Sequence, residues 1–237
     1  MRDFDRSWDA LRPVSIQRNY IKHPAGSVRI AFGDTHVICT ATIESRVPSF
    51  LAGTGKGWVT AEYAMLPGSA GGGRISRNAN TKGRSQEISR LIGRSLRSVV
   101  DMEALGERQI IVDCDVLQAD GGTRTAAITG GYVALCDAVD FLVKTGEISK
   151  SPITDQCAAI SIGIINNETL LDLCYEEDFA ADVDLNLVMK NDGTIIEIQG
   201  TAEGEAFDRT LLNSMLDAGE KGIRELMVMQ NEALEDG

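Results

Sequence analysis

The chain of 237 residues is long enough to bury a substantial core, and its 43% of hydrophobic residues is ordinary for a soluble globular protein. A formal net charge of −12 argues against sequence-independent binding of nucleic acid by the whole surface. No run approaches the ~18 apolar residues that a membrane span needs, and the first ten residues carry acids where a signal peptide has basic and apolar ones. We therefore expect a cytoplasmic protein with no membrane partner.

The cysteine and histidine content gives little support for a zinc site. No two cysteines stand close enough in sequence to form a zinc-type pair, and His23 and His36 are the only histidines. An odd number of cysteines in apolar surroundings is typical of reduced, buried thiols in the cytosol. We expect this state for Cys39, Cys114, Cys136, Cys157 and Cys174.

The first hundred residues are predicted to contain a hairpin, a loop and a helix. Residues 27–44 alternate between apolar and polar side chains around Gly33-Asp34, as in a hairpin with a two-residue turn. Residues 66–83 are glycine-rich and polar, which predicts a loop. Ser85 is the expected N-cap of the next helix, whose apolar positions recur at helical spacing: Ile88, Leu91, Ile92, Leu96 and Val99. Another stripe of this helix faces solvent or a partner and carries Arg90, Arg94 and Arg97.

The rest of the chain also combines hairpins with helices. We expect a strand at residues 108–118, then a glycine turn and a helix through Leu142. Hairpins follow at 157–176 and 184–200, and then an amphipathic helix. Because hairpins rather than βα units connect the strands, the pattern predicts the α+β class. No linker demands two independent domains, so residues 1–237 are expected to form one domain.

The glycine turn lies in the stretch LQADGGTRTAAITGG, which begins at residue 117. Gly121 and Gly122 let the backbone approach a ligand closely, and the N–H groups at a helix start attract an anion. Thr123 adds a hydroxyl donor, and Arg124 adds a fork suited to phosphate oxygens. The alternative is ordinary packing, in which the glycines make the turn and Thr123 caps the helix.

A second helix start, KGRSQEI, places Arg84 in a comparable position just before its first turn. Taken separately, each turn is better explained as the beginning of an ordinary capped helix. Two such turns beside an acidic block favour phosphate binding.

Basic and acidic residues are concentrated in different segments. Between residues 74 and 97 a single acid, Glu87, stands among the bases Arg74, Arg77, Lys82, Arg84, Arg90, Arg94 and Arg97. Between residues 168 and 184 there is no base, and the acids are Glu168, Asp172, Glu176, Glu177, Asp178, Asp182 and Asp184. This separation suggests an anionic substrate that meets a metal ion, although solvated faces of opposite sign would give the same pattern.

In the acidic block, Asp178 and Asp184 bracket a short connection. Asp182, Asp184 and Asn186 then alternate onto one face of the following strand. Carboxylates held together repel one another, and Mg²⁺ or Mn²⁺ would relieve that repulsion while leaving positions for phosphate oxygens and water. A solvated hairpin end is the alternative.

Several long motifs resemble bacterial ribonuclease PH, over essentially the whole sequence from about Leu11 to the last helix. They are CDVLQADGGTRTAAITG, EISRLIGRSLR, FGDTHVICTA, GWVTAEYAMLP and IEIQGTAEGE. The resemblance implies an α+β domain of the ribosomal-protein-S5-domain-2-like type built from two related halves. It also implies a homohexameric ring made of three dimers, a cytoplasmic location, and phosphorolytic 3′→5′ trimming of tRNA precursors and other RNAs.

The resemblance also implies roles for individual residues. Arg84 matches the phosphate-binding arginine of the family, and Gly122, Thr123 and Arg124 match its remaining contacts to inorganic phosphate. Asp178 and Asp184, in the stretch CYEEDFAADVDLN, match its metal-linked or acid–base carboxylates. Silent, RNA-binding ring subunits of this superfamily usually lack the arginines or the aspartates, and a hydrolytic nuclease would not need the glycine turn.

The glycine-rich loop departs from the family pattern. Relatives typically have an arginine directly after MLP, where this chain has Gly68, and their loop is longer and more basic. Arg74 and Arg77 still align with family arginines and are expected to contact RNA. This departure affects the expected binding of the body of tRNA and not the expected chemistry.

Overall fold

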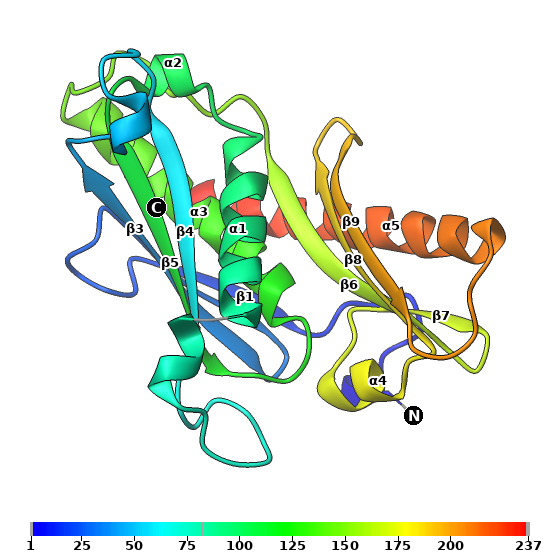
Figure 1. The fold of residues 1–237 in the computed structure, drawn as a ribbon. Coiled ribbons are helices and arrows are strands. Elements are labelled where there is room, and N and C mark those ends of the chain that lie inside the picture. The colour runs from blue at the N-terminus through cyan, green and yellow to red at the C-terminus, as the bar shows by residue number, and fades with distance from the viewer. Residues whose placement is uncertain (1, 82, 236–237) are drawn as a thin grey trace.

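The computed structural model describes residues 2–81 and 83–235, and it contains two β-sheets with helices between and beside them (Figure 1). The first sheet has the strand order β1-β2-β3-β5-β4 and is antiparallel except where β4 pairs with β5. Its strands are β1 (Val14–Arg18), β2 (Gly26–Phe32), β3 (Thr35–Glu44), β4 (Trp58–Met65) and β5 (Gln109–Gln118). The second sheet is antiparallel in the order β7-β6-β8-β9, formed by β6 (Cys157–Ile165), β7 (Glu168–Leu171), β8 (Val183–Lys190) and β9 (Ile195–Ala202).

The helices pack on the faces of these sheets or lie at their ends. The α-helices are α1 (Arg84–Arg97), α2 (Met102–Leu105), α3 (Thr123–Lys144), α4 (Tyr175–Ala180) and α5 (Arg209–Glu235). Short 3₁₀ turns are η1 (Asp3–Asp5), η2 (Ser49–Leu51) and η3 (Arg77–Thr81). One hydrophobic core runs through both sheets and the three long helices.

Helix α3 is the element shared by the two sheets. Toward the first sheet, a Cβ added at Gly130 would lie 2.7 Å from the side chain of Ile30, so the helix approaches β2 closely. Toward the second sheet, the Thr129 hydroxyl donates to the carbonyl of Ala159 at 3.2 Å and accepts from its N–H at 3.1 Å. The N-terminus of α3 therefore lies at the seam between the sheets.

By length and composition α3 would suit a membrane span, contrary to the expectation that no segment would. Its 18-residue window has a mean hydropathy of 1.5, but 78% of that window is buried inside the protein. Its apolar character is therefore accounted for by contact with two sheets at once.

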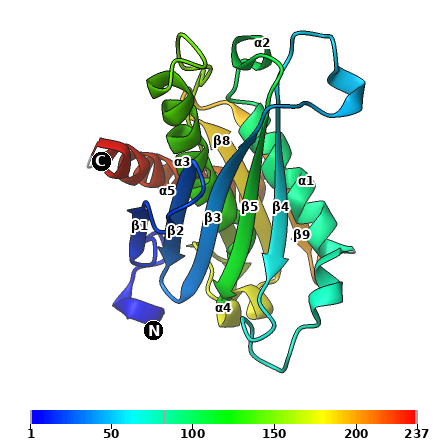
Figure 2. The same cartoon turned by 90° about the vertical axis from the view of Figure 1, so that its left-hand side faces the viewer.

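One face of the first sheet is not covered by any helix in the described part of the chain (Figure 2). Helices α1 and α3 pack on the opposite face, where alternate residues of β3 and β5 are buried. On the open face, partial burial raises the pKa of Asp113 and Asp115, and the neighbouring charges of Asp115 and Glu62 raise that of Asp113 further.

The predicted hairpins, strand and long helices are confirmed, with corrections at their ends. The turn of the first hairpin is Gly33-Asp34, and all five cysteines are free thiols, with only Cys136 partly exposed. The predicted N-cap Ser85 is wrong, because α1 begins one residue earlier behind Gly83. Thr123 does not cap α3 either; it is the first helical residue, and Gly122 precedes it in the left-handed region. Strands β1 and β4 and the short helix α4 were not anticipated from the sequence.

Candidate active site

The glycine turn before α3 has the conformation that an anion site needs. Gly121 and Gly122 have φ of 71° and 65°, in the region that side chains disfavour. A Cβ at Gly121 would also meet the carbonyl oxygen of Leu173 at 2.5 Å. The turn is therefore fixed as glycine by both backbone and space, and it leads into a 22-residue helix whose first N–H groups have no partner within the helix.

A buried arginine donates hydrogen bonds to the carbonyl groups of this turn. Arg12 donates through Nη1 to the carbonyl of Asp120 at 2.5 Å and through Nη2 to that of Gly121 at 3.5 Å. Its Nη2 also contacts Asp172 at 2.7 Å, and both side chains of this ion pair are completely buried. Thr35 completes the support, because its hydroxyl donates to the Gly121 carbonyl at 2.6 Å. The turn is thus held by contacts from two distant parts of the chain, and Arg12 is itself fixed by a third, at Asp172.

The two predicted phosphate arginines both lie near enough to Tyr63 for their charges to act on it, and Tyr63 is hydrogen-bonded to Thr123. The Tyr63 hydroxyl and Thr123 Oγ1 are 2.8 Å apart in a buried hydrogen bond. Burial raises the pKa of Tyr63, while the Thr123 hydrogen bond and the charges of Arg84 and Arg124 oppose that rise. Arg84 is exposed at the start of α1, and Arg124 donates to Gln199 on β9 at 2.9 Å. The structure therefore places Arg84 and Arg124 in the neighbourhood of Tyr63 and Thr123, at the start of α3.

The two predicted carboxylates lie on the other side of the seam. Asp178 is on α4 and Asp184 is on β8, where it alternates with buried residues as expected. Burial of the carboxyl group raises the pKa of Asp178, although the residue has exposed surface, and the charges of Arg84 and Arg124 oppose the rise. Burial also raises the pKa of Asp184, with the Asp178 charge adding to it. The acids are therefore near each other and near the arginines.

A third acid, Glu203, contributes to the same field and raises the pKa of both aspartates. Even so, no group of three His, Cys, Asp or Glu side chains converges as a metal-binding set within residues 2–81 and 83–235. Two mutually repelling carboxylates fit the way Mg²⁺ is commonly bound, through one or two carboxylates with the remaining positions left to water and phosphate. Asp178 and Asp184 are the carboxylates that would hold such an ion.

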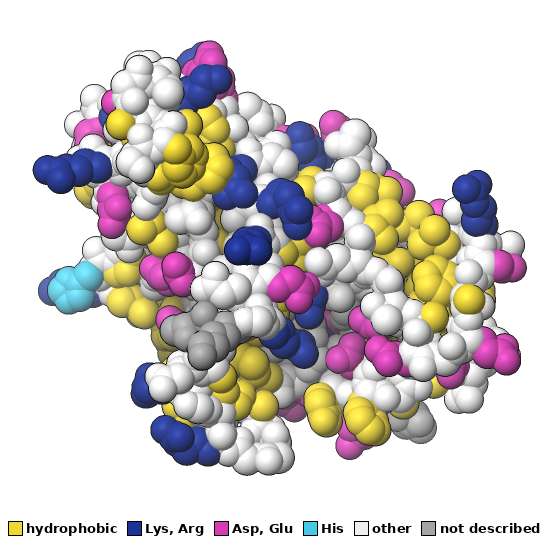
Figure 3. Space-filling model, viewed as in Figure 1, with side chains coloured by type: hydrophobic (Ala, Val, Ile, Leu, Met, Phe, Trp, Pro, Cys, Tyr) yellow, Lys and Arg dark blue, Asp and Glu magenta, His cyan; other side chains and the backbone are white. Residues whose placement is uncertain are grey.

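The predicted RNA contacts, Arg74 and Arg77, are exposed on the loop between β4 and α1. This loop leads directly into Arg84 and extends beyond the end of the first sheet, below α1 in Figure 1. On the same face of the molecule, basic side chains gather over α1 and acidic ones over the region of α4 and β8 (Figure 3). The segregation of charge seen in the sequence thus reappears as two neighbouring patches on one face.

The family models match in two parts that contain these two patches. Residues 10–139 match domain 1 of the 3′ exoribonuclease family, and residues 155–222 match its domain 2. The chain belongs to the 3′ exoribonuclease family. The first match contains the glycine turn and both arginines, and the second contains both aspartates. That residues 1–237 form a single folding unit stays a prediction.

Solved structures with the same fold extend over nearly the whole chain of this family member. Rrp46 from rice (Oryza sativa) aligns with a TM-score of 0.78 at 20% identity, covering 98% of this chain and 100% of that one. An Archaeoglobus fulgidus exosome "with RNA bound to the active site" aligns at 0.76 with 22% identity, covering 93% and 89%. An archaeal exosome core aligns with a TM-score of 0.75 at 22% identity, covering 95% of this chain and 89% of that one. The predicted α+β fold of the ribosomal-protein-S5-domain-2-like type is confirmed.

Residue-by-residue sequence reasoning missed Arg12, Tyr63, Gln199 and Glu203. Tyr63, Gln199 and Glu203 lie within motifs that carried the family resemblance, but nothing local marks their roles. Arg12 has no local signal, since its partner Asp172 is 160 residues away in sequence.

Proposed function

We propose that this chain is a phosphorolytic 3′→5′ exoribonuclease of the bacterial ribonuclease PH type, which trims the 3′ ends of tRNA precursors and other RNAs in the cytoplasm. One observation carries the proposal: the glycine turn with Thr123 and Arg124 at a helix start lies near Asp178 and Asp184, because the charge of Arg124 acts on both carboxyl groups. A cationic cradle beside an acidic pair suits a reaction between two phosphate groups.

In the proposed reaction, inorganic phosphate is bound by Arg84, Arg124, Thr123 and the N–H groups behind Gly122, and an oxygen of it attacks the terminal phosphodiester. A bond forms between that oxygen and the RNA phosphorus, and the bond from phosphorus to the 3′-oxygen breaks. The products are a nucleoside 5′-diphosphate and RNA shortened by one residue. The bond formed resembles the bond broken, so the reverse addition of nucleotides from diphosphates is expected too.

The acids serve the leaving group. The 3′-oxygen needs a proton as it departs, and the carboxyl group of Asp178 or Asp184, whose pKa is raised by burial, would donate it. The carboxylate of the pair that is ionised would hold Mg²⁺ or Mn²⁺, which would supply charge neutralisation at the phosphoryl oxygens when bound.

RNA binding and assembly are proposed on similar grounds. The exposed loop with Arg74 and Arg77 adjoins the site, and an exosome of the same fold is described with RNA in its active site. The open face of the first sheet leaves surface for neighbours in a ring, and we propose a homohexamer of three dimers.

The deciding experiment follows a 3′-terminally extended tRNA with and without phosphate and identifies the products by chromatography. Phosphate-dependent release of nucleoside diphosphates is the expected result. Monophosphates released without phosphate would identify a hydrolytic nuclease, and binding without degradation would identify a silent ring subunit. Either outcome refutes the proposal.

Arg124→Ala tests the phosphate site within the same assay. It removes a charge-assisted contact worth about 1.5–3 kcal/mol, so the rate at limiting phosphate should fall at least ~10-fold. The matched control is Arg94→Ala, since Arg94 is an exposed arginine of α1 that pairs with Glu197 at 2.8 Å. An unchanged phosphate dependence in Arg124→Ala would remove this residue from the site.

A further inference from the structure

Two arginines near the N-terminus, Arg2 and Arg6, converge on one glutamate of α4. Arg2 donates in a fork to Glu177, with Nε–Oε1 of 2.7 Å and Nη2–Oε2 of 2.9 Å. Arg6 donates to the same Oε2 at 2.9 Å. Figure 1 shows the N-terminus beside α4. The first residues of the chain thus hold an element of the second half.

The same two arginines also bind the backbone that leads into α4. Arg2 donates to the carbonyl of Leu171 at 2.7 Å, and Arg6 donates to that of Asp172 at 2.7 Å. The side chains of Arg2 and Glu177 are only 12% exposed and that of Arg6 only 3%, so these contacts are shielded from competing water.

Glu177 also caps the start of α4. Its Oε2 accepts the N–H of Cys174 at 3.1 Å, which completes a capping box at the helix N-terminus. Helix α4 has six residues, fewer than a helix needs to be stable alone. Its place is therefore determined by external contacts, and Asp178 is the next residue after the clamped glutamate.

We propose that Arg2 and Arg6 are positioning residues for the exonuclease reaction, acting through Glu177 to hold Asp178 opposite the phosphate turn. The inference rests on the proposed function. It assigns a role to the N-terminal segment, which otherwise lies outside the phosphate cradle. The two arginines do not touch the proposed reacting atoms; they fix the helix that carries one of the acids.

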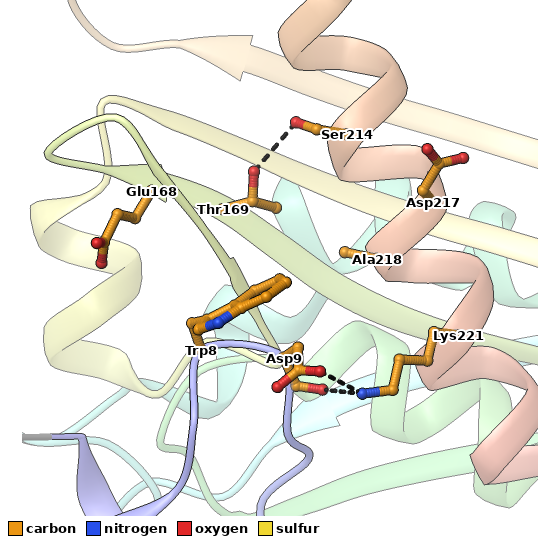
Figure 4. A pocket seen from close by; sticks show the side chains of 8 residues that line it. All are labelled: Trp8, Asp9, Glu168, Thr169, Ser214, Asp217, Ala218 and Lys221. Atoms are coloured by element: carbon orange, nitrogen blue, oxygen red, sulfur yellow. Dashed lines mark hydrogen bonds and ion pairs between the residues drawn. The ribbon is translucent and has the colours of Figure 1, made fainter.

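The same segment offers a matched control at a different place. Asp9 pairs with Lys221 of α5 at 2.5 Å, at the edge of a cavity of about 540 Å³ that Trp8 also lines (Figure 4). None of the predicted site residues lines this cavity. The pair is partly exposed and ties the segment to α5 rather than to α4, so breaking it loosens the segment without releasing Glu177.

The test compares Arg2→Ala/Arg6→Ala with Lys221→Met, using phosphorolysis of a short oligonucleotide. The arginine variant should lose about 10- to 100-fold in kcat through misplacement of the acid, whereas the KM for phosphate should stay within about twofold because the cradle is intact. Lys221→Met should change neither quantity by more than about twofold. Replacing both arginines by lysine should restore only part of kcat, since an ammonium group lacks the fork.

Hydrogen exchange gives a readout that does not depend on activity. The amides of residues 175–180 should exchange faster in the arginine variant, while those of α3 stay protected. The positioning role would be overturned if the arginine variant kept its full kcat, or if Lys221→Met lost as much kcat. It would also be overturned if the KM for phosphate rose in parallel with the loss of kcat, or if the two lysines restored kcat completely. A wild-type protein without phosphorolysis would instead refute the proposed function, and unchanged exchange in α4 would then refute the clamp separately.

Discussion

Replacing Arg12 by methionine should destabilise the protein more than most surface changes, because Asp172 would remain as a buried and unpaired carboxylate. Both side chains are 0% exposed, and Asp172 accepts from the backbone N–H, Nε and Nη2 of Arg12 at 2.7–3.0 Å. Breaking a buried pair from one side costs about 3–5 kcal/mol. For a chain of this size each kcal/mol lowers Tm by about 2–4 °C, so the expected fall is about 6–20 °C.

A double-mutant cycle separates the ion pair from the other contacts of Arg12. Asp172→Asn keeps a residue that tolerates the left-handed φ of 56° at this position while removing the charge. The free energy of unfolding is measured by urea denaturation at one fixed protein concentration. The double variant Arg12→Met/Asp172→Asn should lose at least ~1 kcal/mol less of it than the sum of the losses in the two single variants. Additive losses, or a single loss below about 1 kcal/mol, would refute the view that this pair anchors the glycine turn.

Three further predictions concern the acids, the loop and the open sheet face. Asp178→Asn should reduce kcat sharply without affecting folding, whereas Glu176→Gln on the same helix should not; full metal-dependent turnover in Asp178→Asn would leave the acidic block as mere surface. Gly68→Arg meets no atom within 4 Å and no positive φ, so it should tighten tRNA binding and steepen its salt dependence by about 0.7 in log–log slope; equal affinities across a salt series would show that the loop does not touch RNA. Asp113 has a pKa raised by burial, so its ionised form opposes folding at pH 7 and its protonated form does not. Asp113→Asn should therefore raise Tm at pH 7 by a few degrees at most, and this gain in Tm should be lost near pH 3. A gain in Tm that persisted near pH 3 would contradict the electrostatic cause.

The elements that could be predicted are those whose signals are local. The two-residue turn at Gly33-Asp34 and the α3 helix are encoded within a few residues of themselves, and both are confirmed. Strand β4 has no such signal, since it is defined by parallel pairing with β5 about 50 residues later. Helix α4 is too short for a period to be seen, and its position depends on distant arginines. The N-cap at Ser85 failed because Gly83, with φ of 53°, already turns the chain into the helix.

In the candidate site too, residues with a local sequence signal could be predicted, whereas arrangements that depend on distant residues could not. Arg84, Thr123 and Arg124 were recognisable because glycine, hydroxyl and guanidinium groups occur together at a helix start. Their convergence with Asp178 and Asp184 depends on tertiary packing, which periodicity cannot show. The supports of the site were invisible for the same reason, since Arg12 and Asp172 are separated by 160 residues.

The distance between the phosphate turn and Asp184 is set by the buried core and by the buried Arg12–Asp172 pair, not by exposed ion pairs across the seam. Arg94–Glu197 crosses the seam, but its arginine is 57% exposed, so it contributes little. In contrast, Thr129 of α3 is fully buried and bonded to Ala159 of β6, and its carbonyl accepts from Gln230 of α5 at 2.9 Å. Buried networks whose members are all bonded define one arrangement, because any shift leaves a polar group unpaired. The turn that begins α3 is therefore held at a fixed place relative to the sheet that carries Asp184, and the two halves can form one site without a strong contact at the surface.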